Sequence, residues 1–227
     1  MIDTAFILAA GKGTRMAPLT DHAPKPLVRL NGRPLLDYVF DHLRGTHVRH
    51  VVVNSFYLPH MVASYLDGVE GFNIRLSHED VLLRKAAPLL GQSPFFMING
   101  DAFWIDGEQG AALATLEAAF LPDSMDILLL LIPVSRMILT EGVGDYDIAP
   151  SGAAHRSKTK NGTHMFTGIR IVHPRILGTM RDGAYSFLQQ MDEAEAAGRL
   201  FALEYSGDWH HISTPDDLKR VEDSLTS

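Results

Sequence analysis

Residues 4–27 read TAFILAAGKGTRMAPLTDHAPKPL, a short apolar run that ends in glycines and positive charges. The run over residues 5–10 is too short to cross a membrane, and Gly11 ends it before a long helix could form, so the pattern predicts a buried strand. Gly11 and Gly13 follow at once, and glycines there let the backbone turn sharply and bring N–H groups close to a ligand. We therefore expect a ligand-binding loop at the carboxyl end of this strand.

Two positive charges accompany the glycines. Arg15 offers a planar fork suited to phosphate oxygens, and Lys25 offers a point charge. Pro24 fixes its own φ and Pro26 disfavours helix for the residue before it, so Lys25 is expected in an extended segment. These residue types predict a polyphosphate-binding loop, with an ordinary surface turn as the alternative. A dinucleotide fingerprint would need glycine where Met16 stands, and the Gly-Lys-Ser/Thr of a Walker loop is absent.

Composition limits the class of protein. A chain of 227 residues suits one sizeable α/β domain, residues 1–227. The net charge of −7 and the lack of a dense Lys/Arg run argue against a nucleic-acid surface. The absence of cysteine excludes disulfides, thiolate metal sites and a catalytic cysteine. The amino terminus lacks the pattern of a signal peptide, so we expect a cytoplasmic protein without a membrane partner.

Strand and helix patterns alternate along the chain. Apolar runs predict strands over residues 50–54, 73–77, 94–98, 125–134, 165–172, 201–205 and 209–212. Helices are predicted over residues 32–45, 58–66, 111–120 and 186–198, and a last one starts with Thr214 as N-cap and Pro215 in the first turn. Residues 142–151 suggest a loop with a short strand, and the polar residues 153–163 suggest a surface loop. The alternation favours a Rossmann-like α/β fold, a mostly parallel mixed sheet flanked by helices.

Asp101 follows the predicted strand 94–98 and Gly100, so its carboxylate is expected at the same sheet edge as the glycine loop. A hard carboxylate at that place suits Mg²⁺, which favours oxygen ligands and substrate phosphates. The alternative is a plain turn, because Asn-Gly-Asp is good turn chemistry. A further glycine, Gly168 in the predicted strand 165–172, allows the close approach of a neighbouring group.

The sequence LAAGKGTRMAPLT followed by PKPL resembles the signature of the sugar-phosphate nucleotidyltransferases, which join a nucleoside triphosphate to a sugar 1-phosphate. The resemblance implies the nucleotide-diphospho-sugar transferase fold and Mg²⁺, or Mn²⁺, held by Asp101. Arg15 would bind the β- and γ-phosphates, and Lys25 would bridge the α-phosphate and the sugar phosphate. Gly142, in EGVGDYD, resembles the family's glycine near the sugar, with a plain turn as the alternative. The residues implied to line the nucleotide are Leu8, Ala9, Ala10, Gly11, Gly13, Thr14 and Arg15.

The sequence departs from the family at the second metal carboxylate, found in a pattern like Trp-x-Asp-x-Gly-Thr. The matching residues 209–214 read WHHIST, so His211 stands where aspartate is expected. Imidazole is a poor Mg²⁺ ligand, although it suits Mn²⁺ or Zn²⁺. His211 could instead bind a metal water, or be a partly buried strand histidine. In a strand Asp208 faces away from His211, so Asp208 substitutes only if the strand starts later.

A second departure lies in SHEDVLLRKAAPLLG, residues 77–91, where Leu83 runs directly into Arg84. Relatives carry a run like Glu-Thr-Gly-Gly-Gly between these two positions, and that run helps to hold the nucleotide base. Either part of the base pocket has been lost, or this sequence omits residues of the natural chain.

The resemblance implies an enzyme of the EC 2.7.7 type that makes a nucleoside diphosphate sugar and releases pyrophosphate. LAAGKGTR, PLLG, INGDAFW, FTGIRIVHPRI and WHHISTP together are similar to bacterial N-acetylmuramate 1-phosphate uridylyltransferases of peptidoglycan recycling. This similarity favours UTP and N-acetylmuramic acid 1-phosphate as substrates and UDP-MurNAc as product. A mannose- or heptose-1-phosphate guanylyltransferase is the alternative, and a non-catalytic nucleotide or sugar-phosphate sensor on the same fold is a third reading. A monomer or homodimer is expected.

Overall fold

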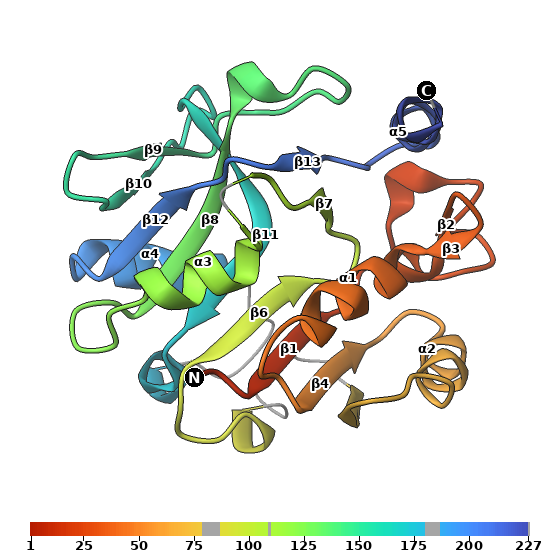
Figure 1. Cartoon of the computed structure of the whole chain (residues 1–227), viewed down its shortest axis with the longest axis horizontal. Coiled ribbons are helices and arrows are strands. Elements are labelled where there is room, and N and C mark those ends of the chain that lie inside the picture. The colour runs from red at the N-terminus through yellow and green to blue at the C-terminus, as the bar shows by residue number, and fades with distance from the viewer. Residues whose placement is uncertain (79–86, 109, 180–186, 227) are drawn as a thin grey trace.

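A nine-stranded mixed sheet lies at the centre of the computed structural model, which describes residues 1–78, 87–108, 110–179 and 187–226 (Figure 1). Its strands run in the order β10-β9-β11-β6-β1-β4-β5, and β8 joins β11 to β12. The strands are β1 (Thr4–Leu8), β4 (His50–Ser55), β5 (Asn73–His78), β6 (Phe95–Asn99), β8 (Ile127–Pro133), β9 (Tyr146–Ile148), β10 (Ala154–Arg156), β11 (His164–Val172) and β12 (Leu200–Glu204). The pairs among β6, β1, β4 and β5 are parallel, whereas β11 runs antiparallel to β6 and β8.

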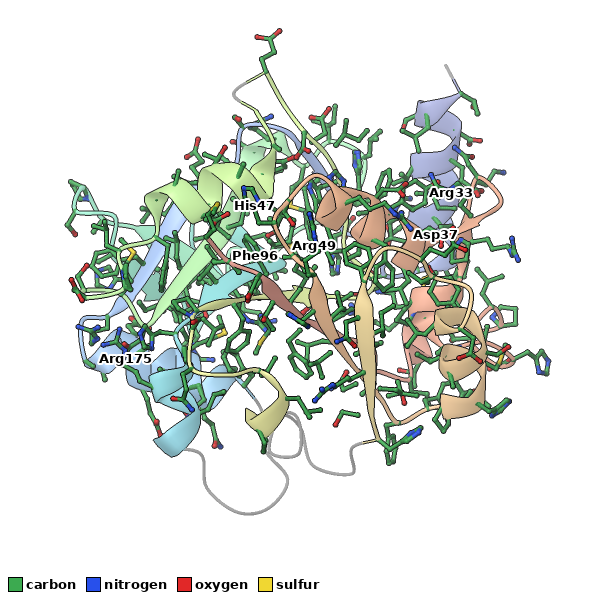
Figure 2. All side chains as sticks on the ribbon, turned by 60° about the horizontal axis from the view of Figure 1, so that its bottom comes forward. Arg33, Asp37, His47, Arg49, Phe96 and Arg175 are labelled. Carbon is green, nitrogen blue, oxygen red and sulfur yellow. The ribbon has the colours of Figure 1, made fainter. Side chains whose placement is uncertain are left out.

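Helices cover both faces of this sheet because its strands are apolar on both sides. Along β1, Ile7 faces the cluster that includes α1 and α3, whereas Phe6 faces the cluster that includes α4. Phe96 belongs to the first cluster and is fully buried (Figure 2). The helices are α1 (Leu35–Arg44), α2 (Pro59–Leu66), α3 (Ala112–Ala119), α4 (Leu188–Ala196) and α5 (Pro215–Leu225). None of the helices in the described ranges combines the length and the apolar character needed to cross a bilayer.

The α/β architecture predicted from the sequence is therefore confirmed, and most predicted strands and helices agree with the structure to within a few residues. The predicted helix 32–45 begins only at Leu35, because residues 29–34 form a small hairpin of β2 (Arg29–Leu30) and β3 (Arg33–Pro34). The predicted helix 186–198 corresponds to α4, and residue 186 lies outside the described residues.

Three local predictions are wrong. Residues 153–163 contain β10, whose Ala154 is buried, and one inward residue in a polar stretch gave too weak a pattern to predict a strand. Lys25 is not extended but begins a single 3₁₀ turn, Lys25–Leu27, which the following proline permits when the turn is that short. The strand predicted over 209–212 is β13 (Asp208–His210), so it ends before His211, and it pairs with β7 (Phe103–Ile105), which the sequence analysis missed.

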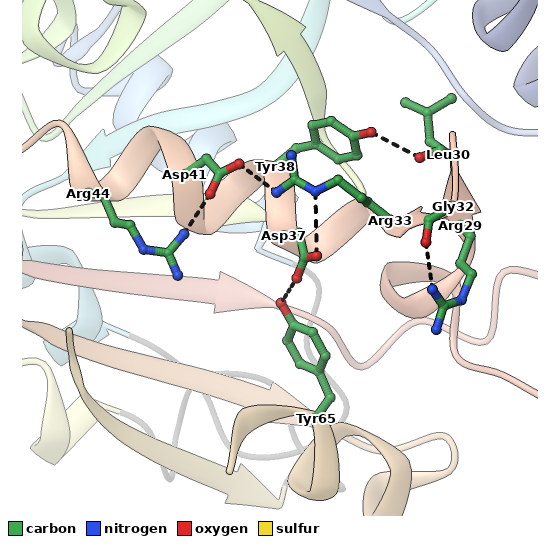
Figure 3. A network of polar contacts seen from close by, with 9 residues as sticks. All are labelled: Arg29, Leu30, Gly32, Arg33, Asp37, Tyr38, Asp41, Arg44 and Tyr65. Carbon is green, nitrogen blue, oxygen red and sulfur yellow. Dashed lines mark hydrogen bonds and ion pairs between the residues drawn. The ribbon is translucent and has the colours of Figure 1, made fainter. Parts of the chain in front are cut away.

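A polar network fixes the start of α1 to its neighbours (Figure 3). Arg33 contacts Asp41 at 2.6 Å and Asp37 at 3.7 Å, and Arg44 contacts Asp41 at 2.6 Å. The Tyr65 hydroxyl of α2 donates to Asp37, and burial, followed by this bond, raises the pKa of Tyr65. Figure 2 shows Arg33 and Asp37 close together. Exposed pairs of this kind contribute about 0–1 kcal/mol each, so the network orients α1 more than it stabilises the fold.

Helix α5 packs on the turn that carries Arg15. Leu218 and Val221 of α5 belong to the same buried cluster as Met16. The helix begins with a capping box, in which Thr214 Oγ1 accepts the Asp217 N–H at 3.2 Å and Asp217 Oδ2 accepts the Thr214 N–H at 2.9 Å. The cap therefore supports a helix that positions the glycine loop.

We expect Thr214→Ala to lower the free energy of unfolding by about 1 kcal/mol, because one N-terminal N–H loses its acceptor. Chemical denaturation followed by circular dichroism measures the change. Thr226→Ala at the other end of α5 is the control, since its hydroxyl only bonds carbonyls of its own helix, and it should change stability by less than about 0.5 kcal/mol. Equal losses in the two variants would contradict the role of the cap.

Candidate functional site

Three neighbouring parallel strands end at one edge of the sheet, where the chain leaves β1. Leu8 pairs in register with Asn54 of β4 on one side and with Asn99 of β6 on the other. The Ala9 N–H donates to Asn54 Oδ1 at 2.7 Å, and the Gly100 N–H donates to the Leu8 carbonyl at 2.9 Å. The start of the glycine loop is thus fixed to both neighbours, at the sheet edge where α/β proteins bind ligands.

Gly13 lets the glycine loop and the turn that begins at Lys25 pack closely against each other. Gly13 has a left-handed φ of 65°, and a Cβ added to it would lie 2.8 Å from Lys25 Cβ. The Thr20 hydroxyl also donates to the Gly13 carbonyl at 2.9 Å. A side chain at residue 13 would therefore push the Lys25 turn away from the loop.

Arg15, Lys25 and Asp101 line one cleft of about 350 Å³, which we call the loop cleft. Lys25 Nζ lies 2.5 Å from Asp101 Oδ2, and both side chains are largely buried, at 13% and 29% exposed. Of the other residues predicted to bind nucleotide, Ala9 is buried and Thr14 is exposed, and neither lines the cleft. The remaining lining residues are Leu8, Ala10, Gly11, Gly13, Pro26, Asn54 and Asn99. A surface of two cations, one carboxylate and backbone groups suits a polyanion together with a cation.

His211 lies beside Asp101 although it is outside β13. Both residues line a small pocket of about 90 Å³ that also contains Lys25 and Asn99. Burial lowers the pKa of His211, the charges of Lys25 and Arg15 lower it further, and Asp101 opposes them. Its imidazole is therefore neutral at neutral pH and free to act as a ligand. Asp208 does not reach this place, because its exposed carboxylate lies 3.9 Å from Arg136 in another pocket.

Asn54 and Asn99 are two polar residues of the cleft that the sequence analysis did not assign to the site. Asn54 is fully buried, and its Nδ2 has no hydrogen-bond partner among the described residues. Asn99 sits against Gly168, whose φ is 82° and whose added Cβ would lie 2.8 Å from Asn99 Cγ. Asn54 is the next-to-last residue of β4, and Asn99 is the last residue of β6. A polar residue at the carboxyl end of an apolar strand is the sequence pattern that could have predicted their place in the site.

Two further sequence predictions remain predictions. Gly142 packs against Met137 and Met165, since an added Cβ would lie 3.2 Å from the sulfur of Met165 and closer still to that of Met137. Met165 also lines the small pocket at Asp101, so Gly142 is near the site without lining a cavity. The junction of Leu83 and Arg84, where the glycine-rich run is missing, lies outside the described residues.

Comparison with known proteins identifies the family. Residues 5–115 match the family described as MobA-like NTP transferase domain. The chain is 31% identical to the N-acetylmuramate alpha-1-phosphate uridylyltransferase of Caulobacter vibrioides, with 97% of this chain and 96% of the relative covered. The chain belongs to the sugar-phosphate nucleotidyltransferase family. Its membership confirms the resemblance read from residues 8–27 and makes it an enzyme of the EC 2.7.7 type.

Other relatives and two solved structures are also similar to the chain. The mannose-1-phosphate guanylyltransferase catalytic subunit beta of Danio rerio is 28% identical, with 94% of this chain but only 62% of the relative covered. A crystal structure of UDP-glucose pyrophosphorylase complexed with UDP-glucose superposes with a TM-score of 0.80 at 15% identity, covering 100% of this chain and 99% of that one. The inositol-1-phosphate CTP transferase of T. maritima gives 0.78 at 19% identity, covering 99% and 95%. The two structures show a shared fold.

Nucleotidyltransferases of this family generally use a divalent metal, and the residues at Asp101 fit one. The described residues contain no group of three or more His, Asp or Glu side chains that could hold a metal by themselves. Asp101 and His211 would supply at most two ligands, which is the usual number where substrate phosphates complete the coordination. The site therefore suits a metal that binds together with the nucleotide.

Gly168→Ala should lower both stability and nucleotide affinity, because the new methyl group meets Asn99 in addition to the strain of a positive φ. Gly198→Ala is the matched control, since residue 198 has a φ of 66° but open space around it. Thermal unfolding and calorimetric titration with UTP measure the two effects. We expect Gly198→Ala to lose about 1 kcal/mol of stability and no affinity. Equal behaviour of the two variants would show that the contact with Asn99 is unimportant.

Proposed function

We propose that this chain transfers a nucleoside monophosphate from a nucleoside triphosphate to a sugar 1-phosphate and releases pyrophosphate. The observation that carries the proposal is the convergence of Arg15, Lys25 and Asp101 in the loop cleft. The names of the relatives favour UTP as the triphosphate and N-acetylmuramic acid 1-phosphate as the acceptor. The product would then be UDP-MurNAc, an intermediate suited to peptidoglycan recycling.

An oxygen of the sugar phosphate attacks the α-phosphorus, in line with the departing pyrophosphate. A phosphate monoester has a second pKa near ~6 and is largely dianionic at neutral pH, so no general base is needed. The protein positions the two substrates and neutralises their charge. Arg15 binds the β- and γ-phosphates and stabilises the leaving group. Lys25 bridges the α-phosphate and the sugar phosphate. Its ammonium group moves from Asp101 to the phosphates when they bind.

Asp101 would hold Mg²⁺, or Mn²⁺, with His211 beside it. The metal supplies charge neutralisation at the phosphate oxygens when it is bound. A neutral imidazole in place of a carboxylate favours Mn²⁺ over Mg²⁺, so the metal preference is a property in which this chain should differ from relatives with an aspartate.

The base would lie over the first residues of the glycine loop. There the Asn54 Nδ2, which has no hydrogen-bond partner in the described ranges, offers a donor to a carbonyl or phosphate oxygen. A guanylyltransferase remains the second candidate because mannose-1-phosphate guanylyltransferases are among the relatives.

We further infer that residues 1–227 act as one domain, since β1 and β12 belong to the same sheet. The enzyme is expected in the cytoplasm, where nucleoside triphosphates are made, as a monomer or homodimer.

Arg15→Ala and Lys25→Ala should each lower the turnover number at least about 100-fold, because each removes a charge that stabilises the transferring phosphates. The assay is pyrophosphate release over a grid of nucleoside triphosphates and sugar 1-phosphates. Lys12→Ala is the matched control, since Lys12 belongs to the same loop but lies over the Tyr57 ring and does not line the cleft. Turnover unchanged in the Arg15 or Lys25 variant would remove its role. Tight nucleotide binding without pyrophosphate release from any pair would favour the sensor.

Removal of divalent metal with a chelator should abolish turnover, and added Mn²⁺ should restore it at a lower concentration than added Mg²⁺.

His211→Asp should reverse this preference by restoring a hard carboxylate, whereas His211→Ala should raise the half-saturating concentration of both metals. Metal titrations of initial rate with the three proteins measure the effect. Identical metal dependence in all three would exclude His211 from the metal site.

A further inference from the structure

A second cavity lies next to the loop cleft and is lined by a buried arginine. This Arg170 cavity measures about 520 Å³ and shares Asn99 with the loop cleft. It opens between β11, the β9–β10 pair and the start of α4, as its lining residues Phe166, Tyr146 and Met191 show. Neither the nucleotide nor the metal assigned above uses it.

Arg170 has no acidic partner among the described residues. It is 3% exposed, and the hydrogen bonds of its Nε and Nη2 to described residues go to the sulfur of Met97, at 3.0 and 2.7 Å. Sulfur is a weak acceptor. Its guanidinium lies 5.1 Å from the Phe166 ring and 4.6 Å from the Phe187 ring. Because both rings also line the cavity, the charged end of Arg170 faces it.

A buried charge without a counter-charge is costly, so this arrangement calls for an anion from outside the protein. Burial, partly opposed by the nearby Tyr146, lowers the pKa of Arg170 to about 9. The Tyr146 hydroxyl is itself buried and has no hydrogen-bond partner within the described part of the chain. Burial also raises the pKa of Tyr146, so its hydroxyl stays protonated and able to donate. A guanidinium held only by a weak sulfur acceptor and a hydroxyl without a partner among the described residues thus line one cavity.

The other charged groups of the cavity leave it positive. Lys158 and Lys160 lie at its edge, and Arg156 is balanced by Asp192, whose Oδ1 lies 2.8 Å from its Nε. Asp145 is the acid among the described lining residues, and its Oδ2 accepts the Phe166 N–H at 3.3 Å. A cavity with aromatic walls and a net positive charge suits a ligand that is partly apolar and carries an anionic group.

We propose that Arg170 pairs with a carboxylate on the sugar of the substrate, so that this chain selects acidic sugar 1-phosphates over neutral ones. The inference rests on the proposed function, because it places the sugar phosphate at Lys25. From there the sugar ring reaches the shared Asn99, and its far side enters the Arg170 cavity. The phosphate is already compensated in the loop cleft, so the anion at Arg170 must be a second one. A carboxylate matches the guanidinium fork and the Tyr146 donor.

The test compares N-acetylmuramic acid 1-phosphate with N-acetylglucosamine 1-phosphate, which lacks only the acidic ether. Arg170→Met should lower kcat/KM for the acidic sugar about 10- to 100-fold, chiefly through KM, and leave the neutral sugar unchanged. Tyr146→Phe should have a smaller effect of the same kind. Arg75→Met, at an exposed strand arginine outside the cavity, is the control for loss of one charge. Arg170→Met should fold, since an apolar side chain replaces an unpaired charge among apolar neighbours.

Equal losses for both sugars, or a wild-type enzyme that uses both sugars alike, would overturn the inference. Absence of pyrophosphate release with every triphosphate and sugar phosphate would instead overturn the proposed function. In that case calorimetric titration of N-acetylmuramic acid 1-phosphate, in the presence of UTP, into wild type and Arg170→Met decides the inference separately. Binding that weakens at least about 10-fold in the variant supports it, and equal binding overturns it.

Discussion

The contact between Gly13 and the Lys25 turn holds the site together, because it brings a lysine from a separate turn against the loop that follows β1. With Gly13 in a left-handed conformation and no side chain at that position, Lys25 reaches Asp101 at the end of the neighbouring strand β6. The ion pair balances a lysine and a carboxylate that would otherwise be costly to bury. The same three strand ends carry Asn54 and Asn99, so the sheet register sets the whole group.

Much of this could be predicted from the sequence because its signals are local. Gly11, Gly13 and the apolar run before them specify a strand, a turn and a loop at one sheet edge, and the parallel register then brings Asp101 to the same edge. The exact backbone at Lys25 could not be predicted, because the two prolines fix neighbouring φ angles but not the packing of the turn on Gly13. Strand β10 could not be predicted because only Ala154 of its three residues is buried, which leaves no alternating apolar pattern.

The features that the sequence could not reveal depend on tertiary packing. Arg170 lies in an apolar strand. From the sequence alone, an arginine in such a strand is expected to point to solvent and to form a salt bridge. Only the folded chain shows that Met97, Phe166 and Phe187 surround it and that it faces a cavity. Asn99 connects that cavity to the loop cleft, and Gly168 leaves room for its side chain. The loop cleft and the Arg170 cavity are thus joined through one asparagine and one glycine.

The most direct test of the central claim is a crystal structure with a non-hydrolysable UTP analogue and Mn²⁺. We expect the triphosphate in the loop cleft, with Arg15 on the β- and γ-phosphates, the metal on Asp101, and Lys25 turned from Asp101 toward the α-phosphate. A nucleotide bound elsewhere, with the ion pair of Lys25 and Asp101 unchanged, would contradict it.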